Sequence, residues 1–328
     1  MSIEPGLPPK SWDTHQRTLG GHFLQSRGWA EFQIALGRIV LFDHAPAWSF
    51  VATERASAKI KYLNLSYGPT LSENSLPDAL SGLMEYAKSN GQTFIRIEPM
   101  GLVSVDQVRN CGLSVTSIEE IEPQLTMLLD LKLSEEELRH NLSSGHRSAI
   151  NGAERRGLSF AHAMADADYE AFIYMMSATA RRAHINTFEP QYFRTLRETL
   201  SKNDNFRLYI AEFENRIVAA CVIFTTPDTW YYAFAASDPE NVKLQAGAPL
   251  LWQAILDAKA AGAGSFDLWG IVPTDTKSAK SGYSHFKRAF GGTTKAYSGS
   301  WDVIVSPAKY RTFQMARSVG RVIRELRR

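Results

Sequence analysis

Residues 206–237 carry the pattern that most constrains the fold of this chain. The segment FRLYIAEFENRIVAACVIFTTPDTWYYAFAAS contains three runs rich in β-branched and aromatic residues, separated by the pairs Glu214-Asn215 and Pro227-Asp228. Such runs predict strands, and the polar pairs between them predict tight turns. Consecutive strands joined by tight turns pair antiparallel. The second half of the chain is therefore expected to be built around a β-sheet.

Helices are predicted before and after these strands. Apolar residues recur at helical spacing in residues 166–183, 189–203 and 248–262, and Ser134 with Glu137 forms a capping box at the start of another helix. Further strands are predicted at 265–271 and 297–307. The first part of the chain shows a looser version of the same order, with a helix at 75–91 between strands at 37–42, 47–54, 59–71, 93–99 and 124–134. This order favours an α/β (α+β) fold made of two copies of one layered unit.

Several classes of site are excluded by what the sequence lacks. It contains no GxSxG elbow, no Walker-type phosphate loop and no HxxxH or HExxH pair, so no metal site is expected. The two cysteines, Cys111 and Cys221, are far apart and fit neither a zinc site nor a disulfide framework. Cys221 lies in the apolar run RIVAACVIF and is expected to be a buried structural thiol.

The termini and the charge suggest where the protein works. The N-terminal residues lack the apolar core of a signal peptide, and no segment is apolar over the length of a membrane-spanning helix, so a cytoplasmic location is expected. The net charge is only +2, but residues 309–328 read as a basic amphipathic helix. That helix is expected to dock on the body of the protein, with contact to anionic lipid headgroups at the membrane surface, or to RNA, as the alternative.

Three groups of residues are left as candidates for chemistry. In the strand WYYAFAAS, Tyr231 and Phe234 are expected near one face and Tyr232 on the other, where they line a site or simply pack in the core. Arg147 and Arg155 lie in HRSAINGAERRG, and on one continuous helix they would form a basic stripe or an ordinary solvated face.

The segment HFKRAFGG, residues 285–292, is the third candidate. It is expected to be a loop in which Lys287 stabilises an oxyanion, while Gly291 and Gly292 let the backbone approach a ligand closely. The plainer alternative is a solvated turn.

Taken together, these motifs resemble those of the FemABX family, the peptidoglycan interpeptide-bridge aminoacyltransferases, in order along most of the chain. The motifs that carry the resemblance are FLQSRGWAEFQIALG, YLNLSYGPT, FIRIEP, the long segment from residue 133 to 160 with its HRSAINGAERRG, YYAFAAS, FDLWGI, FKRAFGG and YSGSWDVIVSP. No long heptad run interrupts residues 130–190, so the chain is similar to family members without a coiled-coil arm.

The resemblance implies two acyltransferase-like domains of the GNAT type. They are expected at residues 1–145 and 146–307, with a C-terminal helix at 308–328 packing back on the first. It also implies that no metal or cofactor is needed and that an aminoacyl group is transferred from aminoacyl-tRNA to an amine of a UDP- or lipid-linked muropeptide. A monomer is expected.

The resemblance further implies roles for individual residues. Lys287 would stabilise the oxyanion, and Glu98 would orient or deprotonate the acceptor amine. Phe286 would stack on the terminal adenosine of the tRNA, and Arg147 and Arg155 would meet its phosphates. The remaining residues expected to bind substrate are Tyr192, Tyr232, Phe234, Trp29, Gln33, Gly291 and Gly292.

Two positions depart from the family pattern. Gln33 and Phe188 stand where basic residues are expected to hold the phosphates of the acceptor. This favours a different phosphate contact, a lipid-linked acceptor, or an acceptor outside the cell wall.

Two other functions stay open from the sequence. The first is a GNAT-type N-acyltransferase that uses acyl-CoA, for which QAGAP, residues 245–249, is a weak match to a pyrophosphate loop. The second is an RNA-binding or membrane-associated module without catalysis.

Overall fold

The computed structural model describes residues 3, 5–57, 60–72, 75–100, 103–110, 112–163, 165–183, 187–274 and 281–326. Cys111 lies outside the described residues. The chain divides into two compact units. Unit 1 contains residues Met1–Gln124 and Tyr297–Arg328, and unit 2 contains Leu125–Ala296. The chain therefore passes from one unit to the other twice.

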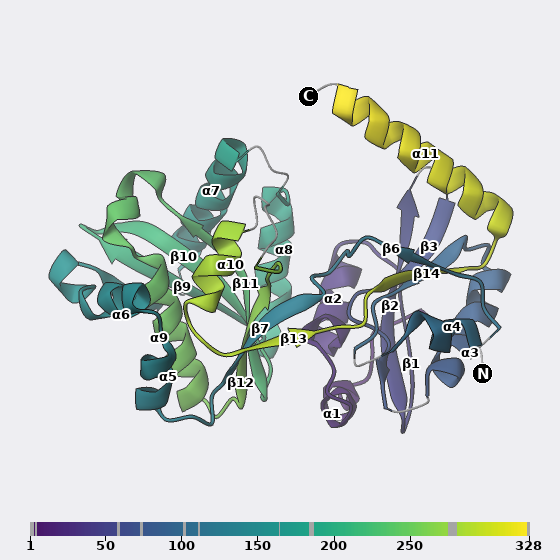
Figure 1. Cartoon of the computed structure of the whole chain (residues 1–328), viewed down its shortest axis with the longest axis horizontal. Coiled ribbons are helices and arrows are strands. Elements are labelled where there is room, and N and C mark those ends of the chain that lie inside the picture. Colours follow the sequence, from purple (N-terminus) through teal and green to yellow (C-terminus); the bar gives the residue numbers. More distant parts are fainter. Residues whose placement is uncertain are drawn as a thin grey trace. The chain divides into compact units, whose positions relative to one another are not determined.

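Unit 1 is a mixed sheet with helices (Figure 1). Its described strands are ordered β1-β2-β3-β5-β14-β6, with β4 paired to β2, and β3 and β5 run parallel while the other neighbours are antiparallel. Its strands are β1 (Val40–Ala45), β2 (Trp48–Ser57), β3 (Ile60–Leu65), β4 (Thr70–Leu71), β5 (Phe94–Ile97), β6 (Val115–Ile118) and β14 (Ser300–Ile304). Its helices are α1 (Trp12–Thr18), η1 (Phe23–Gln25), α2 (Arg27–Ala35), α3 (Leu76–Ser89), α4 (Val105–Asn110) and α11 (Pro307–Leu326).

Unit 2 has a second mixed sheet, ordered β13-β7-β12-β11-β10-β9-β8 among the described residues. Here β11 and β12 form the parallel pair. Its strands are β7 (Leu125–Asp130), β8 (Ser159–Ala163), β9 (Phe206–Phe213), β10 (Arg216–Thr225), β11 (Thr229–Ser237), β12 (Ser265–Gly270) and β13 (Thr293–Ala296). Its helices are α5 (Glu135–Asn141), α6 (Ser144–Asn151), η2 (Glu154–Arg156), α7 (Asp166–Ala183), α8 (Pro190–Leu200), η3 (Ser201–Asn203), η4 (Pro239–Leu244), α9 (Gly247–Ala260) and α10 (Ser281–Arg288).

The two units share one plan, and the predicted fold class is confirmed. Each sheet has one parallel pair of neighbouring strands among otherwise antiparallel ones. The segment that connects the two parallel strands contains a helix, α3 in unit 1 and α9 in unit 2. In each unit the inner strand next to that pair comes from a distant part of the chain. These strands are β14, beside β5, and β7, beside β12.

These two strands also set the boundaries of the units. Residues 125–145 belong to unit 2 and residues 297–307 to unit 1, whereas the boundaries expected from the sequence are at residues 145 and 307. Pairing of β7 with β12 and of β14 with β5 is the physical reason, because a strand belongs to the sheet that satisfies its backbone hydrogen bonds.

Each unit has its own apolar core. In unit 2 the core includes Cys221, which is buried as predicted. In unit 1, α11 leaves the end of β14 (yellow in Figure 1), and its residues Tyr310 and Phe313 pack against Phe94 of β5. Burial of this aromatic group holds the first half of α11 on the sheet.

Candidate functional site

Lys287 lies inside unit 2 and not in an exposed loop. It is in the last turn of α10, and its Nζ donates a hydrogen bond to the Gly270 carbonyl oxygen at 2.8 Å. The same Nζ lies 6.0 Å from the centre of the Tyr232 ring, a cation–π distance. Within the described part of the chain Gly270 is its one hydrogen-bond partner, which leaves two N–H groups for a ligand.

The Lys287 side chain lies at the point where strands β11 and β12 stop pairing. The parallel pairing of β11 with β12 covers only Thr229–Tyr231 and Ser265–Asp267, although both strands continue further. Beyond this point the two strands no longer pair, at the carboxyl end of a parallel pair where sheets of this kind place ligands. Tyr232 and Gly270, the two groups that Lys287 contacts, lie just past the end of the pairing.

A bulge in β12 gives this end of the strand its shape. The register of β12 against β7 shifts between Asp267 and Gly270, and Trp269 takes a left-handed backbone conformation with φ of 62°. Asp267 holds the bulge, because its Oδ1 accepts a hydrogen bond from the Trp269 N–H at 2.7 Å. Thr126 of β7 donates its hydroxyl to the same oxygen.

Burial shifts the pKa values of both Lys287 and Asp267. Burial lowers the pKa of the Lys287 ammonium to about 8, while the negative charge of Asp267 opposes that shift. Burial also raises the pKa of Asp267, against the hydrogen bonds from Thr126 and Trp269 and the charge of Lys287. At neutral pH Lys287 is therefore mostly protonated, yet it can lose its proton more easily than an exposed lysine.

The expectation of a loop at residues 285–292 is wrong, because α10 extends to Arg288. The helix is held from the side by α6, where His146 Nε2 lies 3.1 Å from the Phe286 carbonyl oxygen and its ring packs on Phe286 and Phe290. Phe286 also lies beside Gly247, the first residue of α9. Lys287 is thus presented by a short helix packed on two others.

Gly291 and Gly292 follow α10 in conformations that favour glycine, with φ of 79° and 92°. A Cβ on Gly292 would lie 2.5 Å from the Leu128 carbonyl oxygen, and one on Gly291 would lie 2.8 Å from that of Asn141. The close approach that the glycines permit is thus to the chain's own backbone.

The aromatic candidates divide between the two faces of the unit 2 sheet. Tyr192 of α8 stacks on Phe188 at 3.9 Å between ring centres, and Phe188 and Phe193 both contact Phe234 of β11. Tyr232 packs against the core on the opposite face, next to Lys287. Tyr192 and Phe234 are therefore brought into one aromatic group, and Tyr232 and Phe286 into the surroundings of Lys287.

Arg147 and Arg155 do not form the predicted stripe, because α6 ends at Asn151 and Arg155 lies in η2. Arg147 donates to the carbonyl oxygens of His140 and Leu142, at the end of α5. Arg155 is exposed.

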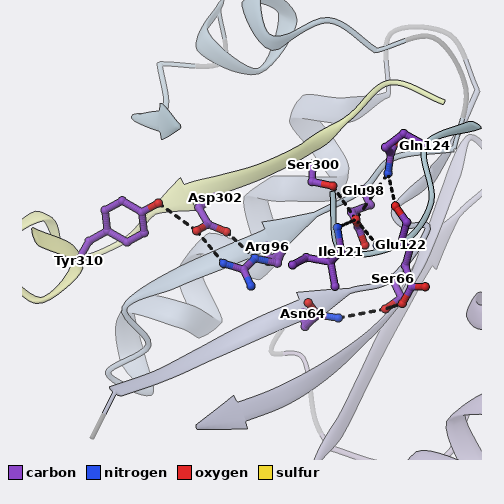
Figure 2. A network of polar contacts seen from close by, with 10 residues as sticks. All are labelled: Asn64, Ser66, Arg96, Glu98, Ile121, Glu122, Gln124, Ser300, Asp302 and Tyr310. Atoms are coloured by element: carbon purple, nitrogen blue, oxygen red, sulfur yellow. Dashed lines mark hydrogen bonds and ion pairs between the residues drawn. The ribbon is translucent and has the colours of Figure 1, made fainter. Parts of the chain in front are cut away.

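Glu98 lies at the centre of a buried polar network in unit 1 (Figure 2). It is only 1% exposed, and its Oε1 accepts hydrogen bonds from the Ser300 hydroxyl at 2.6 Å and from the backbone N–H groups of Glu122 and Ile121 at 2.9 and 3.1 Å. Burial raises the pKa of Glu98, and these hydrogen bonds oppose the shift. This carboxylate ties together the chain segments that lead out of unit 1 and back into it.

Glu122 is a second carboxylate of the same network, and it accepts a hydrogen bond from Ser66 at 2.9 Å. Burial and the charge of Glu98 raise its pKa to about 7. Two neighbouring carboxylates that resist ionisation together behave as a coupled pair.

This shift predicts a pH-dependent stability that Glu122→Gln should remove. A folded-state pKa raised above the unfolded value of 4.5 stabilises the protein below pH 4.5, and the contribution is lost as the pH rises to about 7. The loss is expected to reach about 3 kcal/mol at most. The measurement is the free energy of unfolding in urea for both proteins between pH 4.5 and 8. A difference between them that does not change with pH would contradict the assignment.

Trp29 and Gln33 lie on α2 in unit 1. The Trp29 ring packs on Phe32 at 5.1 Å, and Gln33 is 1% exposed. Gln33 Oε1 accepts hydrogen bonds from Arg38 and from Arg55 Nη2, the latter at 3.3 Å. No sequence motif indicates either arginine, because they are 5 and 22 residues from Gln33 and only the fold brings them to it.

Comparison with known proteins gives this architecture a context. The chain is similar to FemX, with 17% identity and a TM-score of 0.77 over 94% of this chain and 99% of that one. The chain has a FemX-like fold. The predicted resemblance to the FemABX family is thereby confirmed at the level of the fold. Residues 140–288 match the family model described as "Acetyltransferase (GNAT) domain", which supports an acyltransferase of the GNAT fold.

Two further structures share the FemX-like fold. One is L-PGS from Bacillus licheniformis, with 12% identity and a TM-score of 0.57 over 93% of this chain and 94% of that one. The other is a tandem GNAT protein from the clavulanic acid biosynthesis pathway, with 9% identity and a TM-score of 0.55 over 93% and 99%. No curated protein sequence matches the chain. In the described part of the chain, no helix combines the length and the apolar character needed to cross a membrane.

Proposed function

We propose that this protein transfers an amino acid from aminoacyl-tRNA to an amine of a peptidoglycan precursor. The observation that carries the proposal is Lys287, a part-buried ammonium with one hydrogen-bond partner among the described residues, held where β11 and β12 separate in a GNAT-type unit. The FemX-like fold and the order of the motifs favour an aminoacyl ester over other activated donors.

The chemistry needs few groups from the protein. The neutral acceptor amine attacks the ester carbonyl, and the carbonyl oxygen becomes an oxyanion. When this intermediate collapses, the C–O bond to the terminal ribose breaks, the ribose hydroxyl leaves with a proton, and an amide remains. Lys287 donates N–H groups to the oxyanion, where a part-buried cation is worth more than one in water. Phe286 packs against the terminal adenosine, as the resemblance implies.

Unit 1 carries a separate group of residues whose chemistry suits the phosphates of an acceptor. Arg38 and Arg55 converge on Gln33, at the position where the family pattern has a lysine, and supply the positive charge that Gln33 lacks. Two guanidinium groups suit phosphates, which they can bind in a bidentate manner. We propose that Glu98 acts by holding the segment around Glu122 in place within unit 1, because its Oε1 already accepts hydrogen bonds from four donors.

The direct test combines the protein with a mixed pool of charged tRNA and with UDP- or lipid-linked muropeptide. A mass gain of one amino-acid residue on the muropeptide, lost when the tRNA is uncharged, is the expected result. No gain with either acceptor at any tRNA charging level would reject the proposal.

Acyl-CoA remains a second candidate donor, favoured by one observation. Helix α9 starts at Gly247 after Gln245, which is in a left-handed conformation, and no side chain caps the start. Uncapped N–H groups at a helix start are suited to a pyrophosphate. Acetylation of the muropeptide amine, or of a small amine, by acetyl-CoA without tRNA would favour this function.

The pH profile of the reaction should show a break near pH 8 that belongs to Lys287. The oxyanion is stabilised by the protonated form, whose pKa is about 8, so the contribution of Lys287 to kcat is expected to decrease about tenfold for each pH unit above that value. This decrease offsets the gain from deprotonation of the acceptor amine, so the rate should stop rising near pH 8. The measurement is kcat between pH 6 and 10 under single-turnover conditions with freshly charged tRNA, corrected for ester hydrolysis. A rate that keeps rising to pH 10 would argue against an ammonium in this role.

A further inference from the structure

Asp267 and Thr126 form a buried pair directly behind the candidate site. Asp267 is 3% exposed and Thr126 is 1% exposed, and the Thr126 hydroxyl donates to Asp267 Oδ1. Thr126 is on β7, which pairs with β12. A buried hydroxyl–carboxylate bond of this kind fixes the carboxylate in one orientation.

The pair is connected to Lys287 through the backbone of β12. Asp267 Oδ1 accepts the Trp269 N–H at 2.7 Å, which stabilises the left-handed conformation at Trp269. A non-glycine residue persists there only when its surroundings impose it. The next residue, Gly270, carries the carbonyl oxygen that binds Lys287 Nζ.

We propose that Asp267, oriented by Thr126, is the positioning residue for Lys287. It fixes the bulge that points the Gly270 carbonyl at Nζ, and it supplies the negative charge that keeps the buried amine protonated. This deepens the proposed function, on which it rests for the statement that Lys287 touches the reacting ester. The geometric claim itself stands on unit 2 alone.

The charged and titratable groups around Lys287 are consistent with Asp267 as its positioning residue. Asp267 of β12 is the group whose charge raises the pKa of Lys287, against burial. Tyr232 of β11 faces the ammonium with its ring, and burial raises the pKa of its hydroxyl, so it stays neutral. Lys295 of β13 acts on Asp267 and, like Lys287, favours its ionised form.

The first experiment measures the pKa and the surroundings of the Lys287 side chain and needs no substrate. In protein with isotope-labelled lysine, NMR follows the Lys287 Nζ and Cε signals with pH in wild type, Asp267→Asn, Thr126→Val and the control Thr126→Ser. Asp267→Asn is expected to lower the pKa of Lys287 by about one unit, because a nearby opposite charge is lost. Thr126→Val is expected to move the Cε signals, which sense the Tyr232 ring, whereas Thr126→Ser keeps them in place.

The second experiment measures kcat and KM in the same variants, once turnover is established. Thr126→Val is expected to lower kcat about tenfold with little change in KM, even at pH 6 where Lys287 is protonated, and Thr126→Ser is expected to restore most of it. In Asp267→Asn the break in the pH–rate profile that belongs to Lys287 should lie about one pH unit lower.

The two experiments separate the possible failures. If wild type transfers no amino acid, the proposed function fails while the NMR result still decides the positioning claim. Folding is checked by the melting temperature, and Thr126→Val, which is nearly isosteric, serves if Asp267→Asn does not fold. An unchanged pKa of Lys287 in folded Asp267→Asn, or unchanged Cε signals in Thr126→Val, would overturn the proposal.

Discussion

Replacing Lys287 by alanine is expected to lower kcat by about 10²–10³-fold, the loss typical of removing one oxyanion donor from a water-excluded site. The effect should fall on kcat more than on KM, because the oxyanion exists only after attack. Lys287→Arg keeps a positive charge, but its wider planar head fits the single Gly270 carbonyl poorly, so it is expected to recover only part of the rate. Single-turnover transfer from charged tRNA is the measurement.

Replacing Lys287 should lower activity but raise the stability of the folded protein. Burial lowers the pKa of Lys287 from 10.5 to about 8, so the folded state loses its proton more readily than the unfolded state. Below pH 8 the buried charge costs about 3 kcal/mol, and this cost disappears as the pH rises from 8 to 10.5. Lys287→Met is therefore expected to be inactive yet more stable than wild type at pH 7, with the gain vanishing near pH 10.5. A variant that is both inactive and less stable at pH 7 would show that Lys287 serves the fold.

Local sequence pattern predicted much of the fold because the strongest elements are determined locally. The strands β9, β10 and β11 end at the two turns expected from Glu214-Asn215 and Pro227-Asp228, and the capping box of Ser134 and Glu137 starts α5. Tyr231 and Phe234 were expected near one face although they are three residues apart. The bulge in the pairing of β10 with β11 makes this spacing possible, because it adds one residue to the strand.

The rest depended on contacts between residues far apart in the chain. α10 was missed because SGYSHFKR offers few apolar residues, and its position comes from packing against α6 and α9. Glu98 looked like a carboxylate at the end of a strand, but Ser300, 202 residues away, closes over it. Lys287 was predicted from its motif, but Asp267 was not. Its partner Thr126 is distant in the sequence, so no local pattern indicates the hydrogen bond between them.

Breaking the buried ion pair of unit 1 is expected to have the largest effect on stability. Arg96 of β5 donates two hydrogen bonds to Asp302 of β14, at 2.8 and 2.9 Å, and Tyr310 donates a third to the same carboxylate at 2.9 Å (Figure 2). The two charged side chains are only 7% and 1% exposed. Asp302→Asn leaves the Arg96 charge buried without its partner, so unit 1 should lose about 3–5 kcal/mol of stability. Hydrogen exchange of the β5 and β14 amides is the measurement, because it reports on unit 1 alone.

The exposed pair of Asp106 and Arg109 provides the matched control. Its N–O distance of 3.0 Å is similar, but Asp106 is 74% and Arg109 56% exposed, so Asp106→Asn should cost less than about 1 kcal/mol. Replacing both members of the buried pair, Arg96→Met with Asp302→Leu, should cost less than Asp302→Asn alone, because no uncompensated charge remains. Equal losses for the buried and exposed single variants would mean that water reaches Arg96. The ion pair would then add little to the backbone pairing that joins β14 to β5 in the sheet of unit 1.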